Sequence, residues 1–263
     1  MLSVILPICS GRVFCLEVSS DFGYNKVYPY VPEVRREMSA MFTAATTDFF
    51  LDLRYHNSKS FMDANRERYL RQVREPFYAF IGALAPAVLT IDPEMETRPN
   101  RCLSRINRDI RFTKDKSPYR DHLWVAFRAS CVGKDGVPFF WFELSPESTG
   151  WGVGIWGENR SAMDAMRRRM TAAPREFLPV LKSLADRGFR LAGDEWKKLR
   201  VPDEIPEALA PWYRKKEIYA ERALLPAAEA FRDDLTERVK ADYLALTPFY
   251  RILRGAAAEE AEQ

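Results

Sequence analysis

Three short runs of aromatic and β-branched residues limit the fold of this chain more than any other feature. They cover residues 123–127, 138–144 and 151–156, and glycine or proline separates each run from the next. Runs of this length and composition predict β-strands. Residues 133–136, with the sequence Gly-Lys-Asp-Gly, predict a turn between the first two runs, so we expect these two to form an antiparallel hairpin.

A helical pattern precedes the predicted strands. Apolar residues recur at intervals of three to four over residues 70–88, and Ser60 and Asp63 have the spacing of a capping box. Pro76 lies inside this pattern, and because an interior proline costs a helix about 3 kcal/mol, we expect a kink or a change of helix there. The region should be closed by two further prolines, Pro86 and Pro93.

Helical patterns also follow the strands. We expect helices over residues 161–172, where Ser161 and Asp164 again have cap spacing, and over residues 174–186, which Gly188 ends. A last amphipathic helix is predicted from Pro226 to about Leu246. Residues 189–220 contain three prolines and are expected to be irregular.

The order of helices, strands and helices, with no internal repeat, predicts an α+β protein. An antiparallel sheet would be flanked by N-terminal and C-terminal helices around a single core, which the 47% of hydrophobic residues can fill. We expect this domain to span residues 42–255. Residues 1–41 are then a poorly ordered extension and residues 256–263 a frayed acidic tail.

Composition narrows the classes of partner. The formal charge is +3, from 40 basic and 37 acidic residues, so a nucleic-acid partner would have to meet a local patch. The four cysteines form no Cys-x-x-Cys pair, which favours a reducing cytoplasm and predicts no metal site. No export signal, cofactor-binding motif or apolar run of the ~18 residues that span a bilayer is found, so we expect no cofactor and no membrane partner.

Positive charge is concentrated between residues 101 and 120. This segment holds seven arginines and lysines and two aspartates, a net +5, so the rest of the chain sums to −2. The planar fork of arginine matches the oxygens of phosphate and carboxylate groups. We therefore expect a surface that binds an anionic, phosphate-bearing small molecule or nucleic acid. The predicted ligand-binding residues are Arg105, Arg108, Arg111, Lys114, Lys116, Tyr119, Arg120 and Gly152.

Gly152 is included because glycines alternate along the third predicted strand, at positions 150, 152 and 154. One face of that strand carries no side chains, so another group can lie close to its backbone.

Two other interpretations stay open. In the first, the protein is an enzyme that acts on a phosphoester, and the candidate catalytic residues are Asp109, Asp115 and His122. In the second, the arginines and aspartates form a salt-bridge network that joins helices to the sheet and binds no ligand. Charged runs of this kind are more often solvated or structural surfaces.

The basic segment also resembles the signature of a known family. Residues 105–120, with the sequence RINRDIRFTKDKSPYR, closely resemble that of the bacterial and fungal family called domain of unknown function 2461. The resemblance extends from about Phe49 to Leu253. It includes an N-terminal helical motif and the central strands, at Asn57, Lys59, Phe61, Asn65, Arg66, Tyr69, Pro76, Ser145, Pro146 and the glycines that end in Gly154.

Two stretches depart from the family pattern. The family commonly has a Trp-Phe pair where this chain has Phe61 and Met62, and it has a Lys-x-Pro-Lys-Gly stretch that residues 197–203 do not reproduce. The resemblance implies an intracellular protein and no particular reaction. It also implies that residues 105–120 are the centre of the function.

Overall fold

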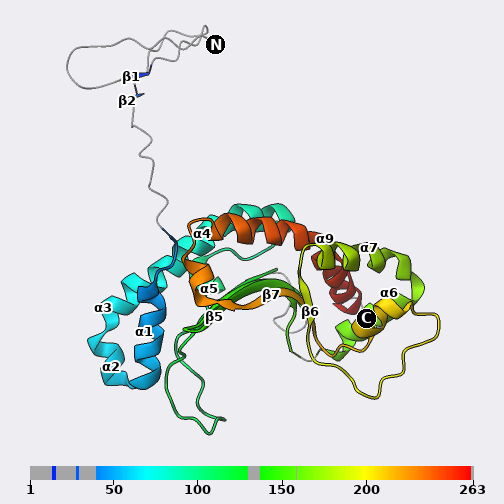
Figure 1. Cartoon of the computed structure of the whole chain (residues 1–263), viewed down its shortest axis with the longest axis horizontal. Helices are drawn as coiled ribbons and strands as arrows, with labels where there is room; N and C mark the ends of the chain where they lie inside the picture. Colours follow the sequence, from blue (N-terminus) through cyan, green and yellow to red (C-terminus); the bar gives the residue numbers. More distant parts are fainter. Residues whose placement is uncertain (1–13, 16–27, 30–39, 130–136, 158, 262–263) are drawn as a thin grey trace. The chain divides into compact units, whose positions relative to one another are not determined.

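The computed structural model describes residues 14–15, 28–29, 40–129, 137–157 and 159–261, and the chain divides into two units, residues 1–39 and 40–263 (Figure 1). In the first unit the short strands β1 (Phe14–Cys15) and β2 (Tyr28–Pro29) pair antiparallel. The expectation that residues 1–41 are poorly ordered falls almost entirely outside the described residues. The second unit contains the sheet and the helices discussed below.

A five-stranded antiparallel sheet lies at the centre of the second unit. Its strands follow the spatial order β3-β4-β5-β7-β6. The five are β3 (Leu123–Arg128), β4 (Phe139–Leu144), β5 (Ser148–Ile155), β6 (Arg190–Ala192) and β7 (Ile218–Pro226). The three predicted strands and the antiparallel pairing of the first two are confirmed. The predicted turn at residues 133–136 lies outside the described residues.

Strands β6 and β7 lie within or overlap the region that was expected to be irregular, so that expectation was wrong. The middle of β7 reads Ala220-Glu221-Arg222-Ala223, which lacks the alternation of apolar and polar residues that marks a strand in sequence. Its stability comes instead from pairing on both sides, with β5 over seven residue pairs and with β6 over three. Such pairing joins residues about 70 positions apart with β5 and about 30 positions apart with β6, and it leaves no local pattern.

The N-terminal helices form a series broken into short pieces. They are α1 (Ala44–Tyr55), α2 (Lys59–Ala64), α3 (Arg66–Tyr69), the π-turn η1 (Leu70–Arg74), α4 (Glu75–Ile91) and α5 (Pro99–Cys102). Ser58 rather than Ser60 caps α2, since its hydroxyl accepts the N–H of Phe61 at 3.2 Å. The predicted cap spacing was therefore two residues too late.

The two helix prolines behave differently. The predicted change of helix at Pro76 is confirmed, because η1 ends and α4 begins beside it. Pro76 has no N–H to donate to the carbonyl of Gln72, and the hydroxyl of Thr46 on α1 donates to that oxygen at 2.7 Å. Pro86 does not end α4, which runs on to Ile91. The carbonyl that Pro86 leaves without a helical partner belongs to Gly82, on the exposed side of the helix, where water can reach it.

The C-terminal part adds four helices and two 3₁₀ turns. They are α6 (Arg160–Ala172), α7 (Pro174–Asp186), η2 (Glu207–Leu209), α8 (Ala210–Tyr213), η3 (Ala227–Phe231) and α9 (Leu235–Ala261). Asn159, not Ser161, caps α6 by accepting the N–H of Ala162 at 3.0 Å. Gly188 follows α7 with a φ of +74°, as predicted for a helix end. The last helix begins nine residues later than Pro226 and continues to Ala261, past the start of the predicted frayed tail.

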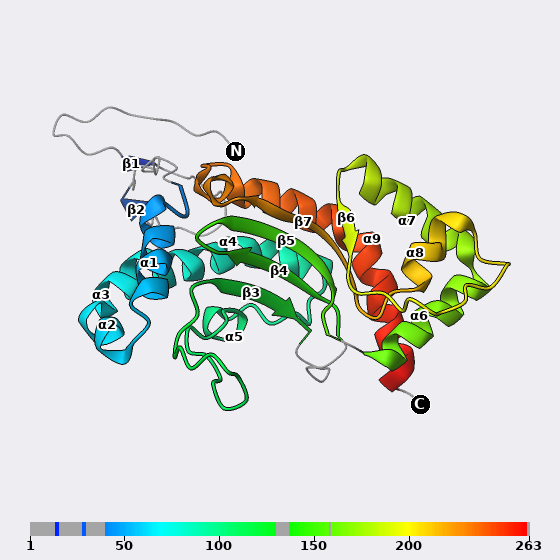
Figure 2. The same cartoon turned by 60° about the horizontal axis from the view of Figure 1, so that its bottom comes forward.

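One apolar core joins the helices to one face of the sheet. Phe140 and Phe142 of β4 are fully buried, and their rings contact Phe80 of α4 and Tyr243 of α9. Figures 1 and 2 show α4 and α9 together on this side of the sheet. The fold is thus α+β with a single core, as predicted. No helix in the described part of the chain is long and apolar enough to cross a membrane.

Candidate functional site

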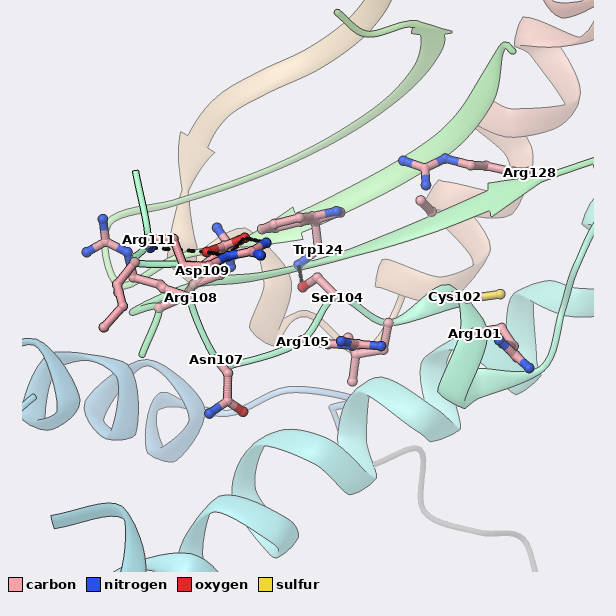
Figure 3. Close-up of a pocket in the computed structure, with 14 residues that line it drawn as sticks. Arg101, Cys102, Ser104, Arg105, Asn107, Arg108, Asp109, Arg111, Trp124 and Arg128 are labelled. Atoms are coloured by element: carbon pink, nitrogen blue, oxygen red, sulfur yellow. Dashed lines mark hydrogen bonds and ion pairs between the residues drawn. The ribbon is translucent and has the colours of Figure 1, made fainter. Parts of the chain in front are cut away.

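A hollow of about 660 Å³ lies beside the edge strand β3. Figure 3 shows that its side chains come from the segment before β3 and from β3 itself, with Arg108, Asp109 and Arg111 at one end and Arg101 and Cys102 at the other. The lining consists of Arg101, Cys102, Leu103, Ser104, Arg105, Asn107, Arg108, Asp109, Ile110, Arg111, Arg120, Trp124, Ala126 and Arg128.

Backbone hydrogen bonds hold the basic segment along the outer edge of the sheet. The N–H of Ser104 donates to the carbonyl of Trp124 at 2.8 Å, and the Ser104 hydroxyl accepts the N–H of Trp124 at 3.0 Å. Further along, the N–H of Arg120 donates to the carbonyl of Ile106 at 2.8 Å. Ile106 and Tyr119 are buried, so the segment is attached to the core while the arginines between them face outward.

The turn between α1 and α2 provides a second attachment. The side-chain amide of Asn57 accepts the N–H of Tyr119 and donates to its carbonyl, both at 3.0 Å. Tyr119 also forms an isolated antiparallel bridge with Asn107, and the two bonds from Asn57 satisfy the backbone N–H and carbonyl of Tyr119 itself. The end of the basic segment that leads into β3 is thereby attached to the N-terminal helices.

The lining carries a surplus of positive charge. Six arginines face one aspartate, Asp109, which leaves the lining at +5. Within the described part of the chain, Arg101, Arg105 and Arg120 form no ion pair with a carboxylate. The guanidinium of Arg120 lies 4.8 Å from the ring centre of Trp124, and its buried Nε has no hydrogen-bond partner there.

The two aspartates of the basic segment are each held by an arginine. Arg111 donates to both oxygens of Asp109, at 2.9 and 2.6 Å, and these bonds lower the pKa of Asp109 to about 2. Asp115 pairs with Arg108 and accepts the N–H of Ser117 at 2.9 Å, and the bonds from Ser117 are the main cause of its lowered pKa. Both carboxylates are therefore charged at neutral pH and carry no proton to donate.

The family resemblance of the basic segment extends over most of the second unit. A family model described as "Conserved hypothetical protein (DUF2461)" matches residues 45–251. The chain belongs to the DUF2461 family. No curated protein matches the sequence. The DUF2461 match runs from α1 into α9 and includes every residue that lines the hollow.

Of the residues predicted to bind a ligand in this DUF2461 protein, the hollow brings together Arg105, Arg108, Arg111 and Arg120. The others lie elsewhere. Lys114 is exposed on the loop, Lys116 donates to the carbonyl of Ile110 at 2.9 Å, and Tyr119 is buried. Gly152 is buried in β5, and a side chain at this position would come within 2.3 Å of the carbonyl of Ala220. The group close to the bare glycine face is therefore strand β7 of the same chain.

The candidate catalytic residues are also separated. Asp109 lines the hollow, while Asp115 stands on the loop outside its lining. His122 lies one residue before β3, where its Nδ1 is 3.0 Å from Oδ1 of Asp121 and its ring stacks on Trp124. Asp121 is in turn bound by Arg54 of α1 at 2.6 Å. These contacts attach the start of β3 to α1 and leave His122 outside the hollow.

Arg128, Trp124 and Ala126 were not predicted as site residues. They alternate along β3 with the fully buried Leu123, Val125 and Phe127, so the period of two already places them on the opposite face. Cys102 was not predicted either. Burial raises the pKa of its thiol to about 12, and its Sγ donates to the carbonyl of Glu96 at 3.1 Å, so it is an unreactive part of the lining. In the described residues, no three His, Cys, Asp or Glu side chains group as metal ligands.

Proposed function

We propose that this protein binds a small phosphate-bearing molecule in the arginine-lined hollow. The main support for the proposal is the positive charge of the lining that no local ion pair neutralises. Asp109 and Asp115 each take up one arginine, and the lining still has three arginines without a carboxylate partner among the described residues. Clustered guanidinium groups with free N–H donors favour an anion with several oxygens, and phosphate is such an anion.

The size of the hollow favours a small molecule over a polymer. At about 660 Å³ it lies within the range of roughly 300–1,000 Å³ that is usual for small-molecule sites. The lining also includes apolar surface from Leu103, Ile110 and Ala126. A ligand that carries both phosphate and an organic group fits this mixture better than inorganic phosphate does.

The test measures binding of pyrophosphate by isothermal titration calorimetry to the wild type and to Arg105→Gln and Arg120→Gln. Each substitution removes one charged donor, worth about 1.5–3 kcal/mol, so we expect roughly 10- to 100-fold weaker binding. Arg200→Gln is the matched control, because Arg200 is 88% exposed, does not line the hollow and lies 3.9 Å from Asp203, its ion-pair partner among the described residues. It should bind pyrophosphate like the wild type.

Equal affinity of wild type and Arg105→Gln for pyrophosphate would rule out the hollow as the binding site. A parallel titration with a fluorescent 20-nucleotide single strand tests the nucleic-acid alternative. If that probe binds more tightly than pyrophosphate and its affinity falls steeply with salt, the ligand is a nucleic acid and the small-molecule proposal fails.

The enzyme interpretation has a separate readout. Asp109 is the one carboxylate in the lining, and Arg111 holds it in the charged form. In the proposed site its role is to position Arg111. Asp109→Asn should therefore weaken pyrophosphate binding only modestly, and loss of a phosphoester-hydrolysing activity in that variant would instead support a catalytic Asp109.

A further inference from the structure

The face of the sheet that is turned away from α4 and α9 carries an unusual set of side chains next to the hollow. Trp124 and Ala126 of β3 lie on this face and also line the hollow. Across the ladder, Trp124 is paired with Glu143 and Ala126 with Trp141 of β4. Figure 2 shows this face of β3, β4 and β5 opposite the helices of the core.

Glu143 is a carboxylate without an ion-pair partner in the described part of the chain. It is only partly exposed, and burial raises its pKa above the usual 4.5. The other glutamate on this face, Glu221 of β7, is 4% exposed and pairs with Arg190 of β6. Glu143 is therefore the carboxylate on this face that is left to accept hydrogen bonds from another molecule.

Trp141 adds an unsatisfied donor on the same strand face, two residues from Glu143. Its indole N–H is shielded from solvent and has no acceptor among the described residues, a condition that is uncommon in folded proteins. The residues paired with Trp141 on the two neighbouring strands are Ala126 and Gly152, which are both small. Strand β7 lies against Gly152, so the indole adjoins the hollow on the side of Ala126, which lines it.

This donor and this acceptor lie within reach of the phosphate site. Neighbouring strands are about 4.8 Å apart, so β4 is one strand away from the lining residues Trp124 and Ala126. A ring placed near Trp141 would thus adjoin Trp124 and Ala126, which line the hollow that holds Arg105 and Arg120. Trp124 has the Arg120 guanidinium 4.8 Å from its ring centre and the His122 ring stacked against it.

We infer that the ligand of the hollow is a guanine mononucleotide whose base lies on the open sheet face, so this inference rests on the proposed phosphate site. The edge of guanine presents two adjacent N–H donors beside a carbonyl acceptor. The donors match the two oxygens of Glu143, and the acceptor matches the indole N–H of Trp141. Adenine offers one amino group beside a ring-nitrogen acceptor and satisfies this pair less well.

The experiment compares GDP, ADP, IDP and pyrophosphate by calorimetry on the full chain. For the wild type we expect GDP to bind at least tenfold more tightly than ADP, with IDP, which lacks the exocyclic amine of guanine, in between. Glu143→Gln should weaken GDP binding about tenfold and leave pyrophosphate binding unchanged. Trp141→Phe should act in the same direction because it keeps the ring and removes the donor.

Folding is checked by the melting temperature of each variant. Neither should melt below the wild type, since one substitution removes a desolvated carboxylate and the other an unsatisfied donor. Equal binding of GDP and ADP to the wild type would overturn the guanine assignment even if pyrophosphate binds. If pyrophosphate does not bind but GDP does, and Glu143→Gln weakens it, the base site stands and the phosphate proposal fails.

Discussion

At the scale of single residues, the glycines of β5 were predicted to let another group lie close to the strand, and the structure shows which group requires them. Their alternation indicates a strand face without side chains, and the structure has such a face. The sequence left open which group lies against it. Strand β7 approaches so closely that a side chain at Gly152 or Gly154 would come within 2.3 Å of its atoms.

A pair of glycine substitutions tests this explanation. Gly152→Ala should destabilise the protein by at least about 2 kcal/mol, because the new methyl group meets the backbone of β7 and the strands must separate. Gly82→Ala is the matched control in the exposed middle of α4, where a side chain would meet no atom within 4 Å. It should raise the free energy of unfolding by about 0.5–1 kcal/mol. Urea unfolding measures both, and a neutral Gly152→Ala would contradict the close approach of β7.

At the scale of elements, a carboxylate on α9 joins that helix to the two central strands. Asp242 accepts the indole N–H of Trp151 on β5 at 2.8 Å and the Nε of Arg222 on β7 at 2.6 Å. Its side chain is 16% exposed, so these bonds are largely shielded from water. The residues involved are about 20 and 90 positions from Asp242, and no sequence pattern joins them.

Removing this carboxylate should loosen the contact between α9 and the sheet. We expect Asp242→Ala to lower the free energy of unfolding by about 2–3 kcal/mol, because Arg222 and the Trp151 indole both lose their acceptor. Asp203→Ala is the control, since Asp203 is 92% exposed and lies 3.9 Å from Arg200. Its unfolding midpoint should not change, and an equal loss in the two variants would mean that the buried position of Asp242 has no special role.

At the scale of the whole molecule, one apolar cluster extends from Phe42 before α1 to Ala256 in α9. It includes residues from the N-terminal helices, the sheet and the C-terminal helices, so the described regions of the second unit share this core. Loss of packing in one region should therefore weaken the others.

We expect urea to unfold residues 40–263 in a single transition. Tryptophan fluorescence reports on β3, β4, β5, α8 and the segments around Trp156 and Trp196, whereas far-ultraviolet circular dichroism reports mainly on the helices. The two midpoints should coincide if the core is shared. Two separate transitions would show that the C-terminal helices form an independent domain.

The sequence alone determined the features that depend on local periodicity and composition. The strands at Leu123–Arg128 and Phe139–Leu144, the helix Pro174–Asp186 and the concentration of charge before β3 all follow from residues close together in the chain. The tertiary structure decided which strands complete the sheet and which arginines face a common hollow. These depend on hydrogen bonds and packing between distant segments, whose free energy is set by the three-dimensional arrangement and leaves no periodic trace in the chain.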